Sequence, residues 1–448
     1  MEITLFEYER IEFDWTDEDR LKILKLEEEQ EKLEKKLDRG EKITLFKLGE
    51  EGGKRYLTAT QYVGVFRLGS RTLQVLPKMY RSPRSESNHR QALRNLLYML
   101  GYVNRLDIEQ EWLDSLQAED LNWYEVLTQL FASNLLTQWH KGAVRSYQSI
   151  SDTLPVLKGK WNLTKQLCHP ERKHLFSVTY DEFTADNHLN QIFRYVVERL
   201  WKSTQNLHIR QDLNRLRQSM DEVTLLPSIN IENTKQIDIT RLNQRYEPLL
   251  NLARLFLRNQ SLELFAGNVK AYTFAFMIDM NQLFEDFVIS FIERNRHEII
   301  PQHLHNCKFR SQAAGVERYM AIKKSNERSV FKIKPDLIIQ NNDEFPMIID
   351  TKYKTLQAED SKLGVSQADF YQMYAYSQRY NSPYILLIYP QTVNMPEPLQ
   401  ATFKTKSNFQ NDECDRTIIA TTIDLRGDLS KQDEKDKLLN RLKELLQY

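Results

Sequence analysis

The segment from Lys334 to Lys354 concentrates the side chains that could do chemistry. It consists of two apolar stretches separated by a polar turn centred near Asp343. If the two stretches form a β-hairpin about that centre, Asp336 lies opposite Asp350 on the neighbouring strand. Two carboxylates that face each other across a sheet repel. A divalent cation removes that objection, since Mg²⁺ is commonly held by one or two carboxylates together with water and phosphate oxygens. The pattern therefore predicts a metal site with Asp336 and Asp350 as ligands.

Lys352 lies two residues beyond Asp350 and therefore on the same face of the predicted strand. There its ammonium group can orient an attacking water or offset negative charge on a phosphoryl transition state, beside a metal that activates water and polarises phosphate. An Asp-x-Lys triplet also arises by chance, as in Asp433-Glu434-Lys435 on a polar helix. The alternative interpretation is an apolar strand that ends in a solvated charge pair. Because a second acid faces Asp350, we favour a site that hydrolyses phosphodiesters.

Two further segments offer secondary candidates for the same site. Upstream, the helix DMNQLFEDFVISF presents Glu285, which could reach the metal through water; its alternative role is that of a surface glutamate. Downstream, Gln372 and Tyr376 are spaced i, i+4 and share one helix face. They could contact the phosphate backbone beside the cut, although such a pair is more often ordinary surface polarity.

The charge of the chain is zero overall but unevenly distributed. Between Asn306 and Lys334 there are eight basic residues and only two acidic residues. Such a strip can neutralise several phosphates, which is the sequence-independent part of DNA affinity. A solvated strand edge is the alternative, but the position of the strip just ahead of the acidic site favours DNA binding. The residues predicted to bind DNA are Lys323, Lys324, Lys332 and Lys334, with Tyr376 added from the downstream helix.

The elements that must position these residues divide the chain into three parts. Residues 1–85 are rich in predicted strands and include a heavily charged helix between Thr16 and Asp38, which suggests an exposed arm. Residues 86–265 keep mostly helical periodicity. Residues 266–448 alternate helix and strand, which predicts helices packed on a mixed sheet. The fold class predicted is a multidomain α+β or α/β protein.

Several other kinds of site and location are disfavoured. No apolar run has the length of a membrane span, and residues 1–15 lack the apolar stretch of a signal peptide, so we expect a cytoplasmic protein. His303, His305 and Cys307 alternate, but a structural zinc site needs a second pair of ligands. The segment Gly49–Arg55 has the wrong spacing for a phosphate-binding loop. It is expected to form a hairpin turn, and any nucleotide hydrolysis must occur in a partner.

Taken together, these residues resemble the PD-(D/E)xK nuclease superfamily, and the Gln372-x-x-x-Tyr376 pair is similar to that of its RecB-like branch. More narrowly, the chain resembles the McrC-type nuclease subunits of McrBC modification-dependent (type IV) restriction systems. The resemblance covers roughly Arg90 to the C-terminus. It rests on the order of the segments RQALRNLLYMLGY, GAVRSY with LKGKW, YDEFTADNHLNQIFR, DMNQLFEDF and IIDTKYK.

The resemblance implies a restriction-endonuclease-like domain at residues 266–448, with Asp336 and Asp350 as Mg²⁺ ligands and Lys352 as the catalytic cation. It implies Glu285 and Gln372 as further catalytic candidates. It also implies a partner, a McrB-like AAA+ GTPase hexamer that binds GTP, recognises modified or methylated DNA and is stimulated by the nuclease subunit. Residues 86–265 are the candidate partner-binding region, and self-association would occur through the complex.

Two other functions fit the same residues. The chain could be chiefly a regulatory subunit that activates the AAA+ partner, although the intact set of Asp336, Asp350 and Lys352 argues against a lost site. It could also be a stand-alone RecB-like repair exonuclease, which would act on DNA ends without a GTPase. The modified base, the recognition sequence and the role of residues 1–85 do not follow from the sequence.

Overall fold

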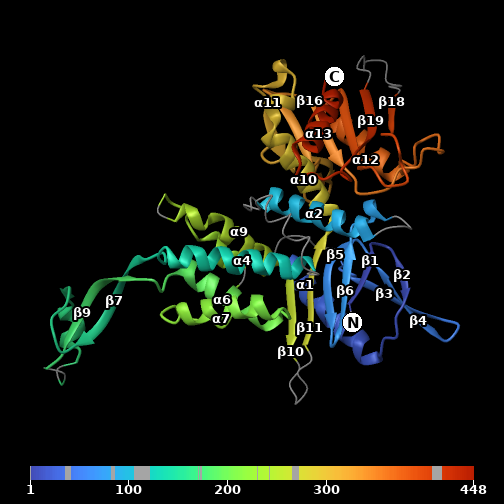
Figure 1. Ribbon diagram of the computed structural model, residues 1–448. Coiled ribbons are helices and arrows are strands. Elements are labelled where there is room, and N and C mark those ends of the chain that lie inside the picture. Colours follow the sequence, from blue (N-terminus) through green and yellow to red (C-terminus); the bar gives the residue numbers. More distant parts are fainter. Residues whose placement is uncertain are drawn as a thin grey trace. The chain divides into compact units, whose positions relative to one another are not determined.

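The computed structural model describes residues 2–35, 42–81, 86–104, 122–169, 171, 174–229, 231–241, 243–264, 272–405 and 416–447. The chain divides into two compact units, one combining Met1–Trp123 with Ser261–Tyr448 and the other consisting of Tyr124–Gln260 (Figure 1). Tertiary contacts thus join the two ends of the chain. Separate domains with boundaries near residues 85 and 265 remain a prediction, because this division does not test whether each part folds alone.

A five-stranded sheet with the order β1-β6-β5-β11-β10 lies in the N-terminal part of the first unit. Every residue of its central strand β5 is buried, as expected for an apolar strand covered on both faces. A three-stranded sheet, β2-β4-β3, lies in the same part, and its β3–β4 turn contains Gly52 and Gly53 as predicted. The elements are β1 (Glu2–Phe6), β2 (Arg10–Glu12), α1 (Asp17–Lys35), β3 (Phe46–Glu51), β4 (Lys54–Ala59), β5 (Tyr62–Leu68), β6 (Arg71–Leu76), η1 (Lys78–Tyr80), α2 (Glu86–Asn104), β10 (Gln260–Leu264) and β11 (Tyr272–Asp279).

Helix α1 is anchored along its described length rather than extended into solvent. Ile23 and Leu26 are buried in the N-terminal core. Glu27 also accepts backbone hydrogen bonds from Leu45 (2.7 Å) and Phe46 (3.4 Å), which satisfies two amide groups near the start of β3. The structure therefore packs this helix onto the core, where its charge had suggested an exposed arm.

Strand β11 carries the chain from this N-terminal sheet into helix α10. It pairs antiparallel with β5, and Met280, the first residue of α10, donates its N–H to the carbonyl of Gln61 (3.1 Å). Asp279 caps the helix by accepting a hydrogen bond from the N–H of Asn281 (2.8 Å). The position of α10 is consequently fixed by the N-terminal sheet.

A second, six-stranded sheet has the order β12-β15-β16-β17-β19-β18. Its β16, β17 and β19 run parallel, whereas β12, β15 and β16 pair antiparallel, so the sheet is mixed, as the sequence predicts. The elements here are α10 (Met280–Arg294), α11 (Arg296–Ile299), η3 (Gln302–Leu304), β12 (Lys308–Ser311), β13 (Arg318–Lys323), β14 (Arg328–Ile333), β15 (Leu337–Asn341), β16 (Glu344–Thr351), α12 (Gln367–Tyr380), β17 (Tyr384–Pro390), β18 (Gln400–Thr405), β19 (Arg416–Ile423) and α13 (Gln432–Leu445).

The second unit combines helices with a long two-stranded ribbon. Phe131 of α4 packs its ring against Phe193 of α6 and Phe256 of α9. Strands β7 and β9 pair antiparallel from Ser146–Thr184 to Leu154–Phe176, and Figure 1 shows this ribbon extending away from the helices of its unit. Its elements are α4 (Trp123–His140), β7 (Ser146–Leu154), β8 (Lys160–Trp161), α5 (Leu163–Leu167), β9 (Phe176–Thr184), α6 (His188–Ser203), α7 (Leu207–Ser219), α8 (Ile231–Lys235), η2 (Gln244–Tyr246) and α9 (Glu247–Asn259).

The multidomain mixed α/β architecture agrees with the predicted fold class. The pattern of the stretch FKIKPDLII (residues 331–339) predicts a single strand, whereas the structure divides it between β14 and β15. Pro335 lies at the break, where its missing N–H and fixed φ do not suit a continuous strand. Of the helices that the structure describes, none combines the length and apolar character needed to cross a membrane.

Gly64 provides a test of the β5–β11 contact that positions α10. A Cβ added at position 64 would clash with the backbone oxygen of Phe276, so the contact between β5 and β11 leaves no room for a side chain at this position. We expect Gly64→Ala to lower the free energy of unfolding by roughly 1–3 kcal/mol, measured by urea denaturation. Gly49→Ala is the matched control, because no atom lies within 4 Å of its added Cβ. Equal stability of the two variants would contradict this account.

Candidate active site

The predicted hairpin and its register are confirmed. Leu337 pairs with Ile349, Ile338 with Ile348 and Ile339 with Met347, and the irregularity lies at the turn end of the hairpin. Asp336 immediately precedes the first of these pairs and Asp350 immediately follows it. The two carboxylates therefore face each other across the strands. They lie on the same sheet face as Ile338 and Ile348, which belong to the apolar core beneath α12.

Asp336 is held in place by backbone and side-chain donors. Its Oδ2 accepts hydrogen bonds from the N–H (2.7 Å) and the hydroxyl (2.9 Å) of Thr351. Its own carbonyl accepts the N–H of Gln312 (2.9 Å). Burial raises the pKa of Asp336, while the bonds from Thr351 and the charge of Lys352 counteract that rise. These hydrogen bonds fix the carboxylate of Asp336, which immediately precedes β15.

Asp350 is fully buried and has few partners. Apart from an ion pair in which Nζ of Lys352 lies 2.6 Å from Oδ2, neither carboxylate oxygen has a hydrogen-bond partner among the described residues. Burial, followed by repulsion from Asp336, raises the pKa of Asp350 to about 7. A buried carboxylate without donors is costly, and such a group in a native fold requires an explanation.

Lys352 supplies a positive charge beside the carboxylates of Asp350 and Asp336. Its N–H bonds to the carbonyl of Ile388 (2.8 Å), which fixes its backbone to β17. Burial alone would lower the pKa of Lys352, but the charges of Asp350 and Asp336 outweigh burial and raise it. The ammonium group therefore stays protonated at neutral pH. This state suits electrostatic stabilisation and excludes a role as general base in this arrangement.

Glu285 of α10 joins the two aspartates. The side chain of Gln312 donates a hydrogen bond to its Oε1. Burial, then repulsion from Asp336, Asp286 and Asp350, raises the pKa of Glu285 to about 8. The predicted convergence of Glu285 on the aspartates is therefore present in the structure, while its part in catalysis remains a prediction.

Gln372 and Tyr376 of α12 make the i, i+4 contact expected from their spacing. Nε2 of Gln372 donates to the hydroxyl of Tyr376 (2.6 Å), which in turn donates to the carbonyl of Lys334 (3.2 Å). Burial and the nearby charge of Asp350 raise the pKa of Tyr376, which places its ring close to the acids. Tyr376 is itself buried. A direct DNA contact by this residue remains a prediction, and its position favours orienting Gln372.

A divalent cation fits the donor set at Asp336 and Asp350. The described residues contain no group of three or more His, Cys, Asp or Glu side chains ready to hold a metal ion. Mg²⁺ does not require one, because it often takes one or two carboxylates and completes its shell with water and phosphate. The buried, unbonded oxygens of Asp350 are the observation that supports the fit. Among the alternating residues His303, His305 and Cys307, His305 differs from Asp350, because its Nε2 already has a hydrogen-bond partner in the carbonyl of Ile300 (2.8 Å).

Sequence reasoning missed a buried cluster directly beside the site. The hydroxyl of Tyr353, the residue after Lys352, donates to Oε2 of Glu7 (2.8 Å), and the N–H of Lys78 donates to the same oxygen (2.9 Å). Nζ of Lys78 donates to the carbonyl of Tyr353 (2.8 Å). Burial raises the pKa of Glu7 to about 8, with Lys78 acting in the opposite direction. Nothing in the pattern around Glu7 indicates a partner so distant in sequence.

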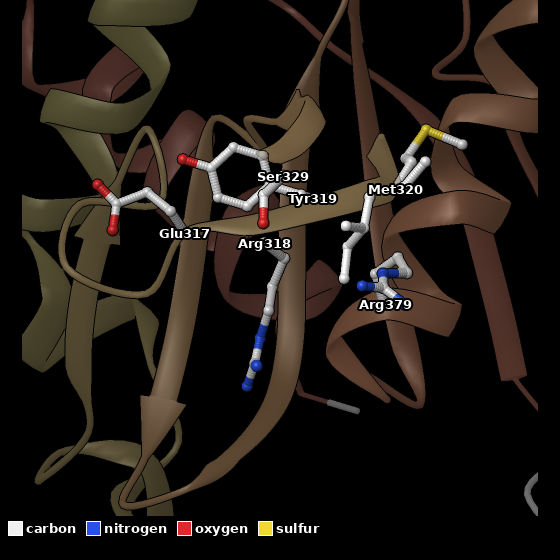
Figure 2. Close-up of a pocket in the computed structure, with 8 residues that line it drawn as sticks. Glu317, Arg318, Tyr319, Met320, Ser329 and Arg379 are labelled. Atoms are coloured by element: carbon white, nitrogen blue, oxygen red, sulfur yellow. The ribbon is translucent and has the colours of Figure 1, made fainter. Parts of the chain in front are cut away.

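Six of the eight basic residues in the predicted strip lie on or beside strands β13 and β14, whereas Lys308 and Arg310 lie on β12. Lys323, Lys324, Lys332 and Lys334 are all exposed, although Lys332 also forms an ion pair with Glu317 (3.4 Å). Figure 2 shows the pocket between this hairpin and α12, with Arg318 and Met320 on β13 and Arg379 on α12. The structure therefore brings these four lysines to one hairpin, and the chain leads from this hairpin through Pro335 into Asp336.

The fold and the site together define a mixed α/β protein in which a carboxylate pair and a lysine lie at the end of a hairpin in a mixed sheet. The family model described as McrBC 5-methylcytosine restriction system component matches residues 57–390. The chain belongs to this family, and the resemblance found in the sequence is confirmed at that level.

Two solved structures are similar to this chain. One similar chain comes from the refined half-complex of a tetradecameric assembly of Thermococcus gammatolerans McrB AAA+ hexamers with bound McrC. It has 23% identity and a TM-score of 0.67, with 99% of this chain and 100% of that chain covered. Another comes from the cryo-EM structure of the Thermococcus gammatolerans McrBC complex, with 28% identity, a TM-score of 0.49 and coverage of 66% and 88%. The first likeness supports the overall fold. A search of curated proteins gave no match.

The raised pKa of Glu285, caused first by burial and then by repulsion from the neighbouring acids, predicts a pH-dependent gain in stability for Glu285→Gln. A carboxyl whose folded pKa is raised destabilises the fold as pH rises above its unfolded pKa, and the full penalty is present above the folded pKa of about 8. In buffer without divalent cations, we expect Glu285→Gln to be more stable than the wild type by roughly 1–3 kcal/mol at pH 8.5, with little difference at pH 5.

Urea denaturation at the two pH values measures this effect. Glu298→Gln, which alters an exposed acid on α11, is the matched control and should leave the pH dependence unchanged. A Glu285→Gln variant that is equally or less stable than the wild type at pH 8.5 would refute the idea that the buried, ionised Glu285 carboxylate destabilises the fold.

Proposed function

We propose that this chain is the nuclease subunit of a McrBC-type restriction system and hydrolyses phosphodiester bonds of modified DNA. Family membership supports the restriction system, and the site supports the reaction. The observation that carries the proposal is the buried Asp350, opposite Asp336 and paired at 2.6 Å with Lys352, with its carboxylate otherwise unbonded. We further propose that residues 266–448 form a PD-(D/E)xK domain around this site.

In this proposal the acids hold Mg²⁺ and the remaining residues organise the substrate. Asp336 and Asp350 would be the protein ligands, and the bound ion would supply polarisation of the phosphate and activation of water. Lys352 places a permanent positive charge where negative charge develops on the phosphoryl oxygens. Gln372, oriented by Tyr376, presents an amide toward the same region. Glu285, with its raised pKa, can hold a proton beside the aspartates at neutral pH.

The second unit offers a surface for the AAA+ partner. The ribbon of β7 and β9, with β8 and α5, carries a concentration of exposed large apolar side chains, which in a folded protein marks an interaction surface. Gly159 allows β8 to lie close to β9, because a Cβ there would approach the carbonyl oxygen of Thr179 to 2.5 Å. We propose that this ribbon binds a McrB-like GTPase hexamer, that GTP is bound by that partner, and that binding stimulates its hydrolysis. The exposed residues are Tyr147, Val156, Leu157, Trp161, Leu163, Leu167 and Phe183.

Lys352→Ala tests the proposed reaction. Removing a charge aimed at the transition state should reduce DNA cleavage by roughly 10²–10³-fold. Cleavage of methylated plasmid is measured with Mg²⁺, the AAA+ partner and GTP, and circular dichroism checks that the variant is folded. Lys435→Ala is a matched control, because Asp433-Glu434-Lys435 repeats the Asp-x-Lys pattern on the helix α13.

The two alternatives give different results in this assay. Undiminished cutting by Lys352→Ala would remove the site assignment. No cutting by the wild type, with faster GTP hydrolysis by the partner, would favour a regulatory subunit. Cutting of DNA ends without partner or GTP would favour a stand-alone exonuclease.

Leu167→Asp tests the partner surface. Placing a charge on an exposed apolar residue of the ribbon should weaken binding to the GTPase hexamer by more than about tenfold, since interface hot spots often contribute at least 2 kcal/mol. Leu207→Asp is the matched control, because Leu207 is similarly exposed but lies on α7 outside the ribbon. Both variants should remain folded, as judged by circular dichroism. Equal loss of partner binding in the two variants would contradict the assignment of the surface to the ribbon.

A further inference from the structure

The hairpin of β13 and β14 exposes large apolar side chains beside the candidate active site. It forms a two-stranded sheet of its own. Met320 is 55% exposed, Ile322 is 69% exposed and Phe331 is 72% exposed, although each belongs to a residue type that folding normally buries. Three such residues on one short hairpin require an explanation.

The pairing of the hairpin brings these apolar residues together. Ile322 pairs with Ser329 and Ala321 with Val330, which places Met320 level with Phe331 on the neighbouring strand. Phe331 has a φ of 59°, a left-handed backbone conformation that a bulky residue adopts rarely. The strand is thus irregular where its largest apolar side chain projects into solvent. Such outliers are often retained at functional positions.

The same hairpin is strongly basic, which identifies the chemistry of its partner. Between Glu317 and Lys334 only two acids oppose six basic residues. Lys332 forms an ion pair with Glu317, and Arg379 of α12 adds a further cation at the pocket under Met320 and Ile322 (Figure 2). A surface that combines cations with exposed apolar side chains complements a nucleic acid, whose phosphates surround stacked apolar bases. The six basic residues are Arg318, Lys323, Lys324, Arg328, Lys332 and Lys334.

The distance to the active site is limited by the chain itself. Two residues, Lys334 and Pro335, lie between Ile333 at the end of β14 and Asp336. The three residue steps of an extended chain span at most about 10 Å. By the same measure Phe331 lies at most about 18 Å from Asp336, which is about five base steps of duplex DNA. The hydrogen bond from Tyr376 to the carbonyl of Lys334 fixes the base of the hairpin to α12 (3.2 Å).

We propose that the β13–β14 hairpin is a DNA wedge, in which Phe331, assisted by Met320 and Ile322, inserts between base pairs near the scissile phosphate while the flanking cations hold the backbone. This inference rests on the proposed action on DNA. Proteins that insert Phe, Ile or Met between base steps unstack and kink the duplex. A kinked duplex at this position would present the phosphate of the cut strand to Asp336, Asp350 and Lys352.

The test compares a matched duplex with one that is already weakened. Full-length protein is titrated by fluorescence anisotropy, in EDTA to prevent cleavage, against a 30-base-pair duplex that is either fully paired or carries a central two-base mismatch. Because a mismatch lowers the cost of unstacking, the wild type should bind the mismatched duplex about tenfold more tightly. Phe331→Ala should reduce this ratio to nearly one. Leu207→Ala, which removes an apolar side chain of the same 72% exposure from α7, should leave the ratio unchanged.

A charge variant separates the wedge from the backbone contacts. Lys323→Ala combined with Lys324→Ala should weaken binding to both duplexes, lower the slope of log affinity against log salt by roughly 1–2, and keep the preference for the mismatch. Phe331→Ala should leave the salt slope unaltered. Since Phe331 is exposed, its removal should not unfold the protein, and circular dichroism confirms this.

The outcomes distinguish the wedge from the nuclease proposal. A wild type without preference for the mismatch, or a Phe331→Ala variant that keeps the preference, would overturn the wedge even if Lys352-dependent cleavage is normal. Loss of AAA+ partner binding by Phe331→Ala, with the mismatch preference intact, would overturn it in favour of a protein-binding hairpin. A wedge that behaves as expected in a chain that never cleaves DNA would instead overturn the nuclease proposal.

Discussion

The burial of three neighbouring acids, Glu285, Asp336 and Asp350, is the constraint on which the surrounding structure depends. Burial raises the pKa of each of these groups, and each lies within electrostatic reach of the others. Such an arrangement is costly in isolation, because charges removed from water require partners. The protein provides Lys352 as one counter-charge and Thr351 as a donor to Asp336, yet it leaves the oxygens of Asp350 otherwise unbonded. This uncompensated burial of Asp350 is the feature on which the proposal of a divalent cation at the site rests.

The N-terminal part of the chain helps to maintain this arrangement. Strand β11 belongs to the N-terminal sheet and continues directly into α10, which carries Glu285. The ring of Phe284, next to Glu285, lies 5.5 Å from the ring of Tyr353, next to Lys352. Glu7 and Lys78 bind both the hydroxyl and the carbonyl ends of Tyr353. Glu7 and Lys78, which the sequence does not connect with the chemistry, thus hold Tyr353 in place. Through Tyr353 they support the neighbouring site residues Lys352 and Glu285.

The sequence predicted the part of the site that depends on local pairing. Asp336 and Asp350 belong to two apolar stretches joined by a short polar turn, so the position of that turn sufficed to set their register. The break at Pro335 was missed because an apolar stretch concealed the end of one strand. The packing of α1 and the bond between Glu7 and Tyr353 could not be predicted, because they depend on tertiary contacts that no periodicity encodes. The burial of Tyr376 was missed for the same reason, since a helix face with polar atoms does not reveal what covers it.

The contact between Tyr353 and Glu7 also bears on how the protein is made. These residues are separated by 346 positions, and the parallel strand β19 enters the sheet still later in the chain. At roughly 5–20 residues per second, a ribosome adds Tyr353 roughly 17–70 s after Glu7. During this interval the nascent chain holds its N-terminal strands but not its completed pair of aspartates. The candidate site can therefore be completed only after Tyr353 and the residues of β19 have been added.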